Sequence, residues 1–441
     1  MVSTHGYVTA HPPLGAEDTG GQVVYVLELS KRLAALGYEV DVWTRRFADL
    51  ADVEPVSERV RILRVPCGGR AFIPKEYLYR HAAEWCEGAR RLAREHGLTY
   101  DFVDSHYWDA GVMAARLARD LGVPHVHTPH SLGLWKRDRM LEDWTDGPEA
   151  MERKYNFRER IAHERAVARD AALVVATSHQ QLDILASGYG VPSSHVAVVP
   201  PGYDDRRFFP VSERRRRAIR ARLGWGDEPV VLAIGRLARN KGYDLLVDGF
   251  ARLARREPAA RLHLAVGGAQ RSPAEEAILQ ALLAQARSLG VERRVDFAGY
   301  VSDAELPDVY RAADCFVLSS RYEPFGMTAV EAMACGTPVV ATLHGGLHRA
   351  LAVGSDALVA DPLDAAALGS AIGQVLETPR LRNRLRKMGP RRARAVFTWD
   401  AVARQVLAGV RDRPGMLDAS GTFELRPGTA SPRSVVGRSR R

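Results

Sequence analysis

Two carboxylates, Glu323 and Glu331, stand eight residues apart where we predict the chain to change from strand to helix. The apolar run 315–318 predicts the end of a buried strand. A helix is expected over 327–334, because glycine and proline break the chain on both sides of it. Glu323 therefore falls in the loop after a strand, and Glu331 about one turn into a helix.

The start of that helix has the features of an anion site. Backbone N–H groups over 325–328 have no partner within the helix, and the helix dipole favours negative charge there. A phosphate could lie on these amides, with Glu323 at one end and Glu331 at the other. Because a carboxylate is a poor phosphate ligand, each glutamate is expected to bind hydroxyls instead. A ligand with hydroxyls on both sides of a diphosphate is a nucleotide sugar, which has a hexose on one side and a ribose on the other. The alternative is an ordinary strand–helix unit with solvated glutamates.

Two cations follow an earlier predicted strand, 230–236. Arg236 and Lys241 lie in the loop 235–242, at the strand's carboxyl end. Arginine offers a bidentate fork and lysine a point charge, so both can converge on one diphosphate. The alternative is a pair of solvated loop cations.

A loop rich in glycine and proline, 5–22, precedes a predicted helix over 23–36. This order is typical of the first strand–helix turn of a Rossmann-like domain, although G-x-G-x-x-G is absent. Gly20 and Gly21 would let the backbone approach a ligand closely. The opening strand, 1–4, is very short, which leaves open a start codon further upstream.

Three histidines, His125, His127 and His130, end another predicted strand. Alternation puts the first two on one face, and no cysteine or carboxylate nearby completes a tetrahedral set, so we predict no metal site. His130, at the carboxyl end, is expected to face a cleft. In the predicted helix 153–169, one of Arg158 and Arg160 is expected to bind a phosphate while the other pairs with an acid. The alternative is an exposed face of salt bridges.

The length of 441 residues and 46% hydrophobic content suit two α/β domains. We place the first at 1–203, completed by a helix at 397–410, and the second at 204–396, with a disordered basic tail at 411–441. The tail holds seven arginines and three acids of a chain whose net charge is +9. The remaining charge suits phosphorylated substrates, and we expect no nucleic acid partner.

No run approaches the ~18 apolar residues of a membrane span, and no signal peptide precedes the first motif. The four cysteines form no C-x-x-C pair. They are interpreted as buried thiols in a reducing cytoplasm, which is the expected location.

Taken together, the motifs resemble those of the retaining glycosyltransferases of the sucrose-synthase-like family (GT4), whose two Rossmann-like domains face each other across a deep cleft (the GT-B fold). The resemblance covers roughly 1–410. The stretches 19–22, 106–107 and 130–133 are similar to its sucrose-phosphate synthase branch. More narrowly, four stretches resemble the bacterial mannosylfructose-phosphate synthases: 3–7, 73–78, 128–133 and 299–301.

The resemblance implies transfer of mannose from GDP-mannose to fructose 6-phosphate. Sucrose-phosphate synthesis from UDP-glucose is the alternative, and a non-catalytic nucleotide-sugar binding protein is a remote one, opposed by the intact charged residues. No cofactor is expected, with Mg²⁺ at most stimulatory. A sugar-phosphate phosphatase is the expected downstream partner.

The resemblance also implies residue roles. Arg236 and Lys241 would bind the donor diphosphate, Glu323 a hexose hydroxyl, Glu331 the ribose, and His130 the hexose near the reacting carbon. The rest of the donor site would comprise Gly21, Val301, Phe325, Gly326, Met327 and Thr328. The acceptor site would comprise Gly20, Gly21, Gln22, Lys75, Tyr107, Ser131, Lys136, Arg158 and Arg160.

Overall fold

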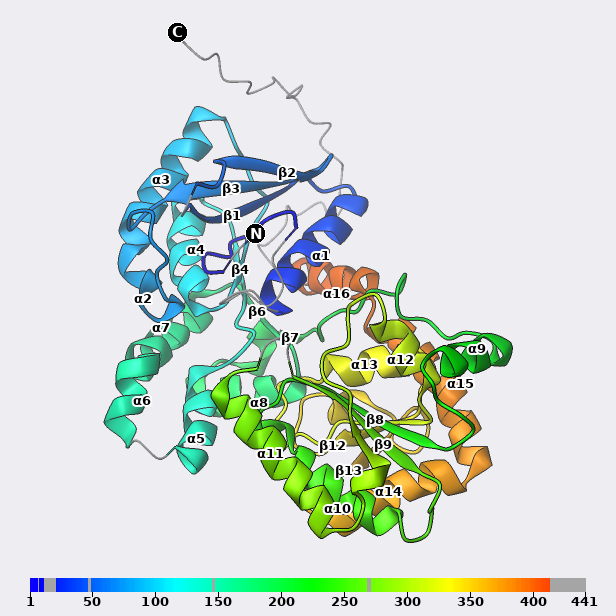
Figure 1. The fold of residues 1–441 in the computed structure, drawn as a ribbon. Helices are drawn as coiled ribbons and strands as arrows, with labels where there is room; N and C mark the ends of the chain where they lie inside the picture. Colours follow the sequence, from blue (N-terminus) through cyan, green and yellow to red (C-terminus); the bar gives the residue numbers. More distant parts are fainter. Residues whose placement is uncertain (7, 12–20, 47–48, 145–146, 268–270, 413–441) are drawn as a thin grey trace.

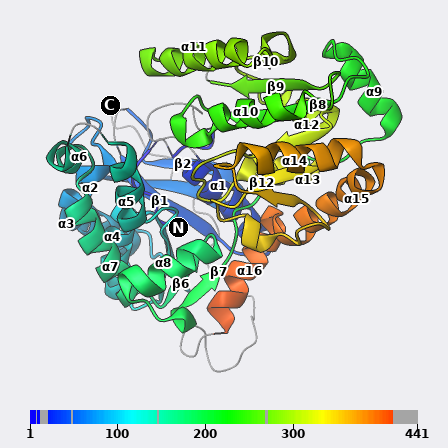
Figure 2. The ribbon, with the colours of Figure 1, turned by 90° about the horizontal axis from the view of Figure 1, so that it is seen from below.

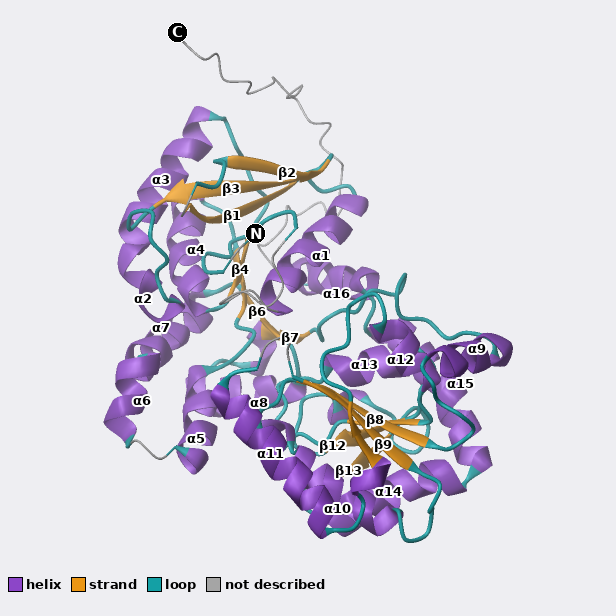
Figure 3. Ribbon diagram, in the orientation of Figure 1, coloured by secondary structure: helices purple, strands orange, loops and turns teal. Residues whose placement is uncertain are grey.

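The computed structural model describes residues 1–6, 8–11, 21–46, 49–144, 147–267 and 271–412. Two α/β domains, each a sheet flanked by helices, lie next to each other (Figures 1 and 3). Gly20 and most of the basic tail, 413–441, lie outside the described residues, so the predictions for them remain untested.

The first sheet is joined through the first residues of the chain. Val2 forms isolated parallel bridges with Trp43 on one side and with Ser105 on the other, within the stretch 1–4 where an opening strand was predicted. Val2 thereby joins two groups of strands, in the orders β2-β3-β1 and β4-β5-β6-β7. Within the first group, β2 and β3 pair antiparallel. The strands are β1 (Val40–Arg46), β2 (Val53–Ser57), β3 (Val60–Pro66), β4 (Val103–His106), β5 (His125–Thr128), β6 (Leu173–Ala176) and β7 (Val196–Val198).

The second sheet is wholly parallel, in the order β10-β9-β8-β11-β12-β13. Its strands are β8 (Val230–Gly235), β9 (Arg261–Val266), β10 (Val295–Phe297), β11 (Cys315–Val317), β12 (Val339–Thr342) and β13 (Leu358–Ala360). The central strands β8 and β11 are buried over most of their length. Both are followed by the loops that carry the predicted donor residues.

Helices cover both faces of each sheet (Figure 2). Those of the first half are α1 (Gly21–Ala35), α2 (Lys75–Leu78), α3 (Ala82–Glu95), α4 (Trp108–Leu121), α5 (Gly133–Asp143), α6 (Pro148–Tyr155), α7 (Phe157–Asp170) and α8 (His179–Tyr189). Those of the second half are α9 (Glu213–Arg222), α10 (Tyr243–Leu253), α11 (Pro273–Ser288), α12 (Leu306–Ala312), α13 (Met327–Ala334), α14 (Ala365–Glu377), α15 (Pro379–Val396) and α16 (Trp399–Arg411).

The last helix returns to the first sheet. Buried residues of α16, among them Trp399 and Val406, share a core with α1 and with strands β1 and β6. Figure 1 shows α16 lying beside α1. The chain crosses between the two domains twice, near Tyr203 and near Phe397. These two crossings pair with each other, since the Tyr203 amide donates to the Phe397 carbonyl at 2.8 Å.

One predicted helix is two helices in the structure. The single helix expected over 153–169 is wrong, because Asn156 interrupts it in a left-handed conformation (φ 50°) and separates α6 from α7. Asparagine adopts this conformation more readily than other non-glycine residues.

The four cysteines are buried free thiols, as predicted. Within the described residues, no helix is both long and apolar enough to cross a membrane.

Candidate active site

Lys241 and Glu323 form an ion pair at the carboxyl ends of β8 and β11. Lys241 Nζ lies 2.6 Å from Glu323 Oε2, and Ser320 Oγ donates to the same oxygen at 3.0 Å. Glu323 is 8% exposed, so the pair is held in a partly desolvated position. Two charges predicted from separate motifs therefore meet in one place.

The backbone holds the two loops together. The Arg321 amide donates to the Asn240 carbonyl at 2.8 Å, and Ser319 Oγ donates to the Lys241 carbonyl at 2.9 Å. Gly242 has φ +64°, and a Cβ there would lie 2.2 Å from the Ser319 carbonyl oxygen. Only glycine combines this conformation with so close an approach.

Helix α13 begins where the sequence predicts. Its N-cap, Gly326, has φ +108°, and a Cβ would lie 2.6 Å from the Leu318 side chain. Phe325 is buried and packs edge-on against Phe397, while Met327 and Thr328 are half-buried. This packing fixes the start of α13 directly after the loop that carries Glu323.

Glu331, in the second turn of α13, is half-buried. Tyr310 OH donates to its Oε2 at 2.9 Å. Burial raises the pKa of this carboxyl to about 7, which Tyr310 and Arg207 partly oppose. The group thus changes charge near neutral pH.

Arg236 is exposed, directly after β8. Close to it lies Tyr243, which is 4% exposed and whose hydroxyl has no hydrogen-bond partner among the described residues. Burial raises the pKa of Tyr243, the nearby Glu323 raises it further, and Arg236 lowers it. Sequence reasoning did not select Tyr243, because tyrosine at the start of a helix carries no distinctive signal.

A buried cluster gathers three of the residues predicted around the acceptor. The Arg160 guanidinium donates to Tyr107 OH at 2.8 Å and to Ser131 Oγ at 2.9 Å. Its Nε donates to Glu164 at 2.7 Å, and Glu164 also accepts from the Gly133 amide. Arg160 is therefore the arginine that pairs with an acid, whereas Arg158 is exposed.

His130 and Tyr107 follow adjacent strands with positive φ angles, 57° and 78°. Such conformations cost about 1–3 kcal/mol in non-glycine residues and occur often at functional sites. Gln181 donates to the His130 carbonyl at 3.0 Å, and His106 Nδ1 lies 3.0 Å from His130 Nε2. Burial, and then the neighbouring histidines, lower the pKa of His130 well below its usual value.

The remaining acceptor-side residues lie on several elements. Gln22 donates to Ser3 Oγ and to the His106 carbonyl, at the carboxyl edge of the first sheet. Lys75 starts α2. Burial raises the pKa of Tyr107, and the charges of Arg160 and Lys75 partly oppose this rise. Lys136 Nζ lies over the Tyr155 ring. Gly21, which was predicted for both substrates, is exposed at the start of α1. On the donor side, the predicted residue Val301 is half-buried after β10.

The two halves of the site touch across the domains. Trp135, next to Lys136, packs edge-on against Tyr322, next to Glu323, with ring centroids 4.1 Å apart. An ion pair between Arg349 and Asp183 and close packing between Gly346 and Ser178 add further contacts. The carboxyl edges of both sheets therefore face one shared region.

His5 was also missed. Its Nδ1 lies 2.8 Å from Asp109, which accepts a hydrogen bond from the Thr4 hydroxyl, and its ring packs against Tyr107. The two partners are about a hundred residues apart, so no local pattern predicts their contact. His125 and His127, by contrast, both contact Ser105 Oγ. They therefore lie on the same face of the sheet, as strand alternation predicts.

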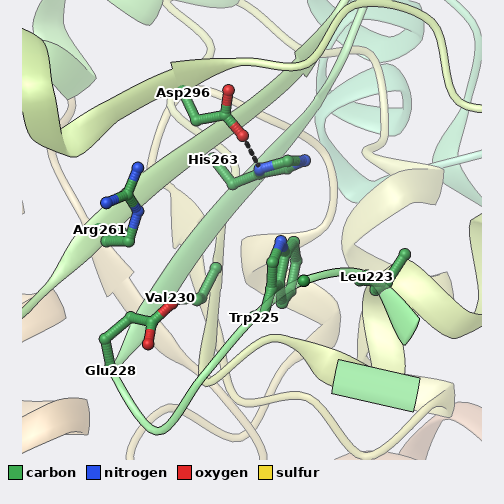
Figure 4. Close-up of a pocket in the computed structure, with 8 residues that line it drawn as sticks. Leu223, Trp225, Glu228, Val230, Arg261, His263 and Asp296 are labelled. Carbon is green, nitrogen blue, oxygen red and sulfur yellow. Dashed lines mark ion pairs between the residues drawn. The ribbon is translucent and has the colours of Figure 1, made fainter. Parts of the chain in front are cut away.

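A hollow of about 350 Å³ lies elsewhere, at the amino ends of β8, β9 and β10 (Figure 4). Trp225 and Arg261 line it, together with an ion pair of 2.7 Å between His263 and Asp296. It contains none of the predicted site residues. Among the described residues, no group of three or more histidine, cysteine or acidic side chains is arranged to hold a metal ion.

Comparisons with known proteins assign both halves of the chain. Residues 19–207 match the family model described as Glycosyltransferase Family 4, and residues 215–392 match Glycosyl transferases group 1. The mannosylfructose-phosphate synthase of Agrobacterium fabrum is 56% identical, over 94% of this chain and 91% of that protein. A D-inositol 3-phosphate glycosyltransferase of Corynebacterium urealyticum is 34% identical, over 97% and 98%.

The solved structures agree. The sucrose-phosphate synthase of Thermosynechococcus elongatus has a TM-score of 0.74 and 33% identity, covering 93% of this chain and 97% of that one. The expected GT-B architecture is confirmed by the two family matches, by the 33% identity to this solved structure, and by the two parallel-sheet domains. The chain belongs to glycosyltransferase family 4 and is a hexosyltransferase with the GT-B fold.

Proposed function

We propose that this enzyme transfers mannose from GDP-mannose to fructose 6-phosphate, giving mannosylfructose 6-phosphate and GDP. The relative that is 56% identical carries the name mannosylfructose-phosphate synthase, which supports this choice of product. The structural observation that carries the proposal is the Lys241–Glu323 pair at the carboxyl ends of two central strands. In open α/β sheets, ligands bind at these ends.

The donor would lie along the loops after β8 and β11. Arg236 and Lys241 would bind the diphosphate together with the first amides of α13, and Glu331 would accept hydrogen bonds from the ribose. Glu323 would accept a hydrogen bond from a hexose hydroxyl while staying close to Lys241. This arrangement places a cation next to the oxygen that must leave and a carboxylate next to the sugar.

The chemistry follows from these charges. As the bond between C1 and the phosphate oxygen stretches, the sugar approaches an oxocarbenium ion and negative charge grows on the leaving diphosphate. Preorganised cations stabilise that charge, and loss of one such group typically costs about 3–4 kcal/mol of barrier. The acceptor hydroxyl attacks C1 from the side of the leaving group, so the anomeric configuration is retained. The departing phosphate takes the hydroxyl proton, so we assign no protein base. Arg236 and Lys241 supply the positive charge, so we propose that no metal ion is required.

The acceptor would lie on the first domain. Lys75, Lys136 and the exposed Arg158 would bind its phosphate, while the enclosed Arg160 holds Tyr107 and Ser131 in place. The backbone at Gly20 and Gly21, with Gln22, would border the sugar. The contact between Trp135 and Tyr322 supports a closed arrangement, in which water is kept from the reacting carbon.

A second candidate is sucrose-phosphate synthesis from UDP-glucose, because the sucrose-phosphate synthase structure matches 93% of the chain. Either product is a disaccharide phosphate, so a sugar-phosphate phosphatase would act next. The four buried free thiols agree with a reducing compartment, which we propose to be the cytoplasm.

A substrate matrix tests the proposal. Purified enzyme would be assayed with GDP-mannose and with UDP-glucose, each against fructose 6-phosphate, free fructose and inositol 3-phosphate, with product identified by mass spectrometry and NMR. We expect the fastest transfer from GDP-mannose to fructose 6-phosphate, with an α-linked product. Preference for UDP-glucose would select the second candidate, and preference for inositol 3-phosphate would exclude both.

A further inference from the structure

A short series of buried groups leads from the core of the first sheet to His130. Asp104 and His106 both belong to β4, and their side chains are 1% and 0% exposed. His106 Nε2 lies 3.5 Å from Asp104 Oδ2, and its Nδ1 lies 3.0 Å from His130 Nε2. His130 is the half-buried member at the carboxyl edge of the sheet.

The aromatic neighbours restrain both rings. Tyr25 packs edge-on against His130, with ring centroids 4.9 Å apart, and tilted against His106 at 5.5 Å. The His130 backbone is held by Gln181. Neither ring is therefore free to turn over without disturbing a packed core, so the contact between the two nitrogens persists.

The proton positions follow from the charges. Among the described residues, neither His106 Nε2 nor Asp104 Oδ1 has a hydrogen-bond partner. A buried carboxylate stabilises a proton on the ring nitrogen that faces it, so His106 carries its proton on Nε2. Its Nδ1 then has a lone pair, and the 3.0 Å contact requires His130 Nε2 to donate.

We propose that Asp104 and His106 are positioning residues that fix His130 as the Nε2–H tautomer. His130 then presents Nδ1 as a hydrogen-bond acceptor to a hydroxyl of the transferred hexose. This inference rests on the proposed function only where it names the hexose. The tautomer itself depends on the β4 side chains, which are too deeply buried to contact a substrate.

The wild-type enzyme provides the first test. With ¹⁵N-labelled histidine, NMR correlations would show which ring nitrogen of His130 is protonated, and His130→Asn identifies the signal by its loss. We expect the proton on Nε2 in the absence of substrate. A proton on Nδ1 would overturn the inference without any variant having to fold.

Asp104→Asn provides the second test. The neutral amide no longer attracts a proton to His106 Nε2 and can donate to that nitrogen instead. We therefore expect the proton of His106 on Nδ1, and the proton of His130 on its own Nδ1. We expect this shift in the spectrum and a fall in kcat of about tenfold to a hundredfold, as is typical when an outer partner of a site histidine is lost. The KM for the acceptor should change much less than kcat.

Ser105→Ala is the matched control, because Ser105 is the buried residue of β4 between Asp104 and His106, and it contacts His125 and His127 instead of His106. It should change kcat by less than about threefold. An unchanged His130 tautomer in Asp104→Asn, whatever its kcat, or an equal fall in kcat for Ser105→Ala, would overturn the inference. Failure of the proposed function would appear differently, as no hexosyl transfer by the wild type in the substrate matrix.

Discussion

Lys241 Nζ lies 2.6 Å from Glu323 Oε2, although the two residues are 82 positions apart in the sequence. Both side chains are mostly buried, so the pair is less screened by water and salt than a surface pair would be. It joins the loop proposed to bind the diphosphate to the loop proposed to bind the hexose.

Removing either member of this pair should nearly abolish turnover. For Lys241→Ala we expect kcat to fall by about 10²–10³, because charge developing on the leaving group loses a preorganised partner. For Glu323→Gln we expect a similar fall, because the proposed hydrogen bond to the hexose is weakened and Lys241 loses the carboxylate that holds it. Initial rates would be measured with saturating substrates, and circular dichroism would check the fold. Arg256→Ala, which removes an exposed cation paired with Glu377, is the control and should keep normal rates. Turnover at the wild-type level in either site variant would refute the assignment.

Gly242→Ala should destabilise the second domain. The new methyl group would lie 2.2 Å from the Ser319 carbonyl oxygen, in addition to the strain of a positive φ. Gly224→Ala is the matched control, since φ is +71° there and no atom lies within 4 Å. The control should lose about 1–2 kcal/mol of unfolding free energy from φ strain alone. Urea unfolding should show a clearly larger loss for Gly242→Ala, and equal losses would mean that the loop adapts.

Donor affinity should rise with pH around neutrality. The pKa of Glu331 is raised to about 7 by burial, so its carboxylate forms as pH passes through that value. A carboxylate accepts hydrogen bonds from ribose hydroxyls better than the protonated acid does. At pH 6 we therefore expect binding of GDP-mannose up to about tenfold weaker than at pH 8.

The same shift sets the sign of the stability change. The unfolded chain releases this proton at lower pH than the folded one, so Glu331 makes the protein less stable as pH rises from the unfolded pKa through about 7. Glu331→Gln should flatten both the affinity and the stability profiles, as followed by calorimetry and thermal unfolding. An unchanged slope in the variant would assign the pH dependence to another group.

Lys75→Ala and Lys136→Ala should affect the acceptor more than the donor. Each removes a cation proposed to bind the acceptor phosphate, so the KM for fructose 6-phosphate should rise by about tenfold or more. The KM for GDP-mannose should change by less than about threefold. Lys31→Ala, an exposed lysine on α1 paired with Glu28, should change neither constant. Similar increases in both constants would contradict an acceptor pocket on the first domain.

Local signals predicted the elements that carry the site. The helix expected over 327–334 is α13, because the glycines at both of its ends have positive φ angles that other residues avoid. At the predicted opening strand, 1–4, the structure has a single bridge residue, Val2, and its pairing with Trp43 and Ser105 is not a local property.

Other features could not be predicted locally. Asn156 divides a helix with a single residue, and α15 continues through Pro390, where a break would be expected. The Arg160 cluster and the contacts among Asp104, His106 and His130 join residues from different elements. Such contacts depend on the packing of the whole domain, which the spacing of residue types does not reveal.

A crystal structure with GDP and fructose 6-phosphate bound would test the central claim most directly. We predict the diphosphate between Arg236, Lys241 and the first turn of α13, with the sugar phosphate opposite it on the first domain, near Lys75 and Lys136. Nucleotide bound at any other place, such as the hollow beside Trp225 and His263, would contradict it.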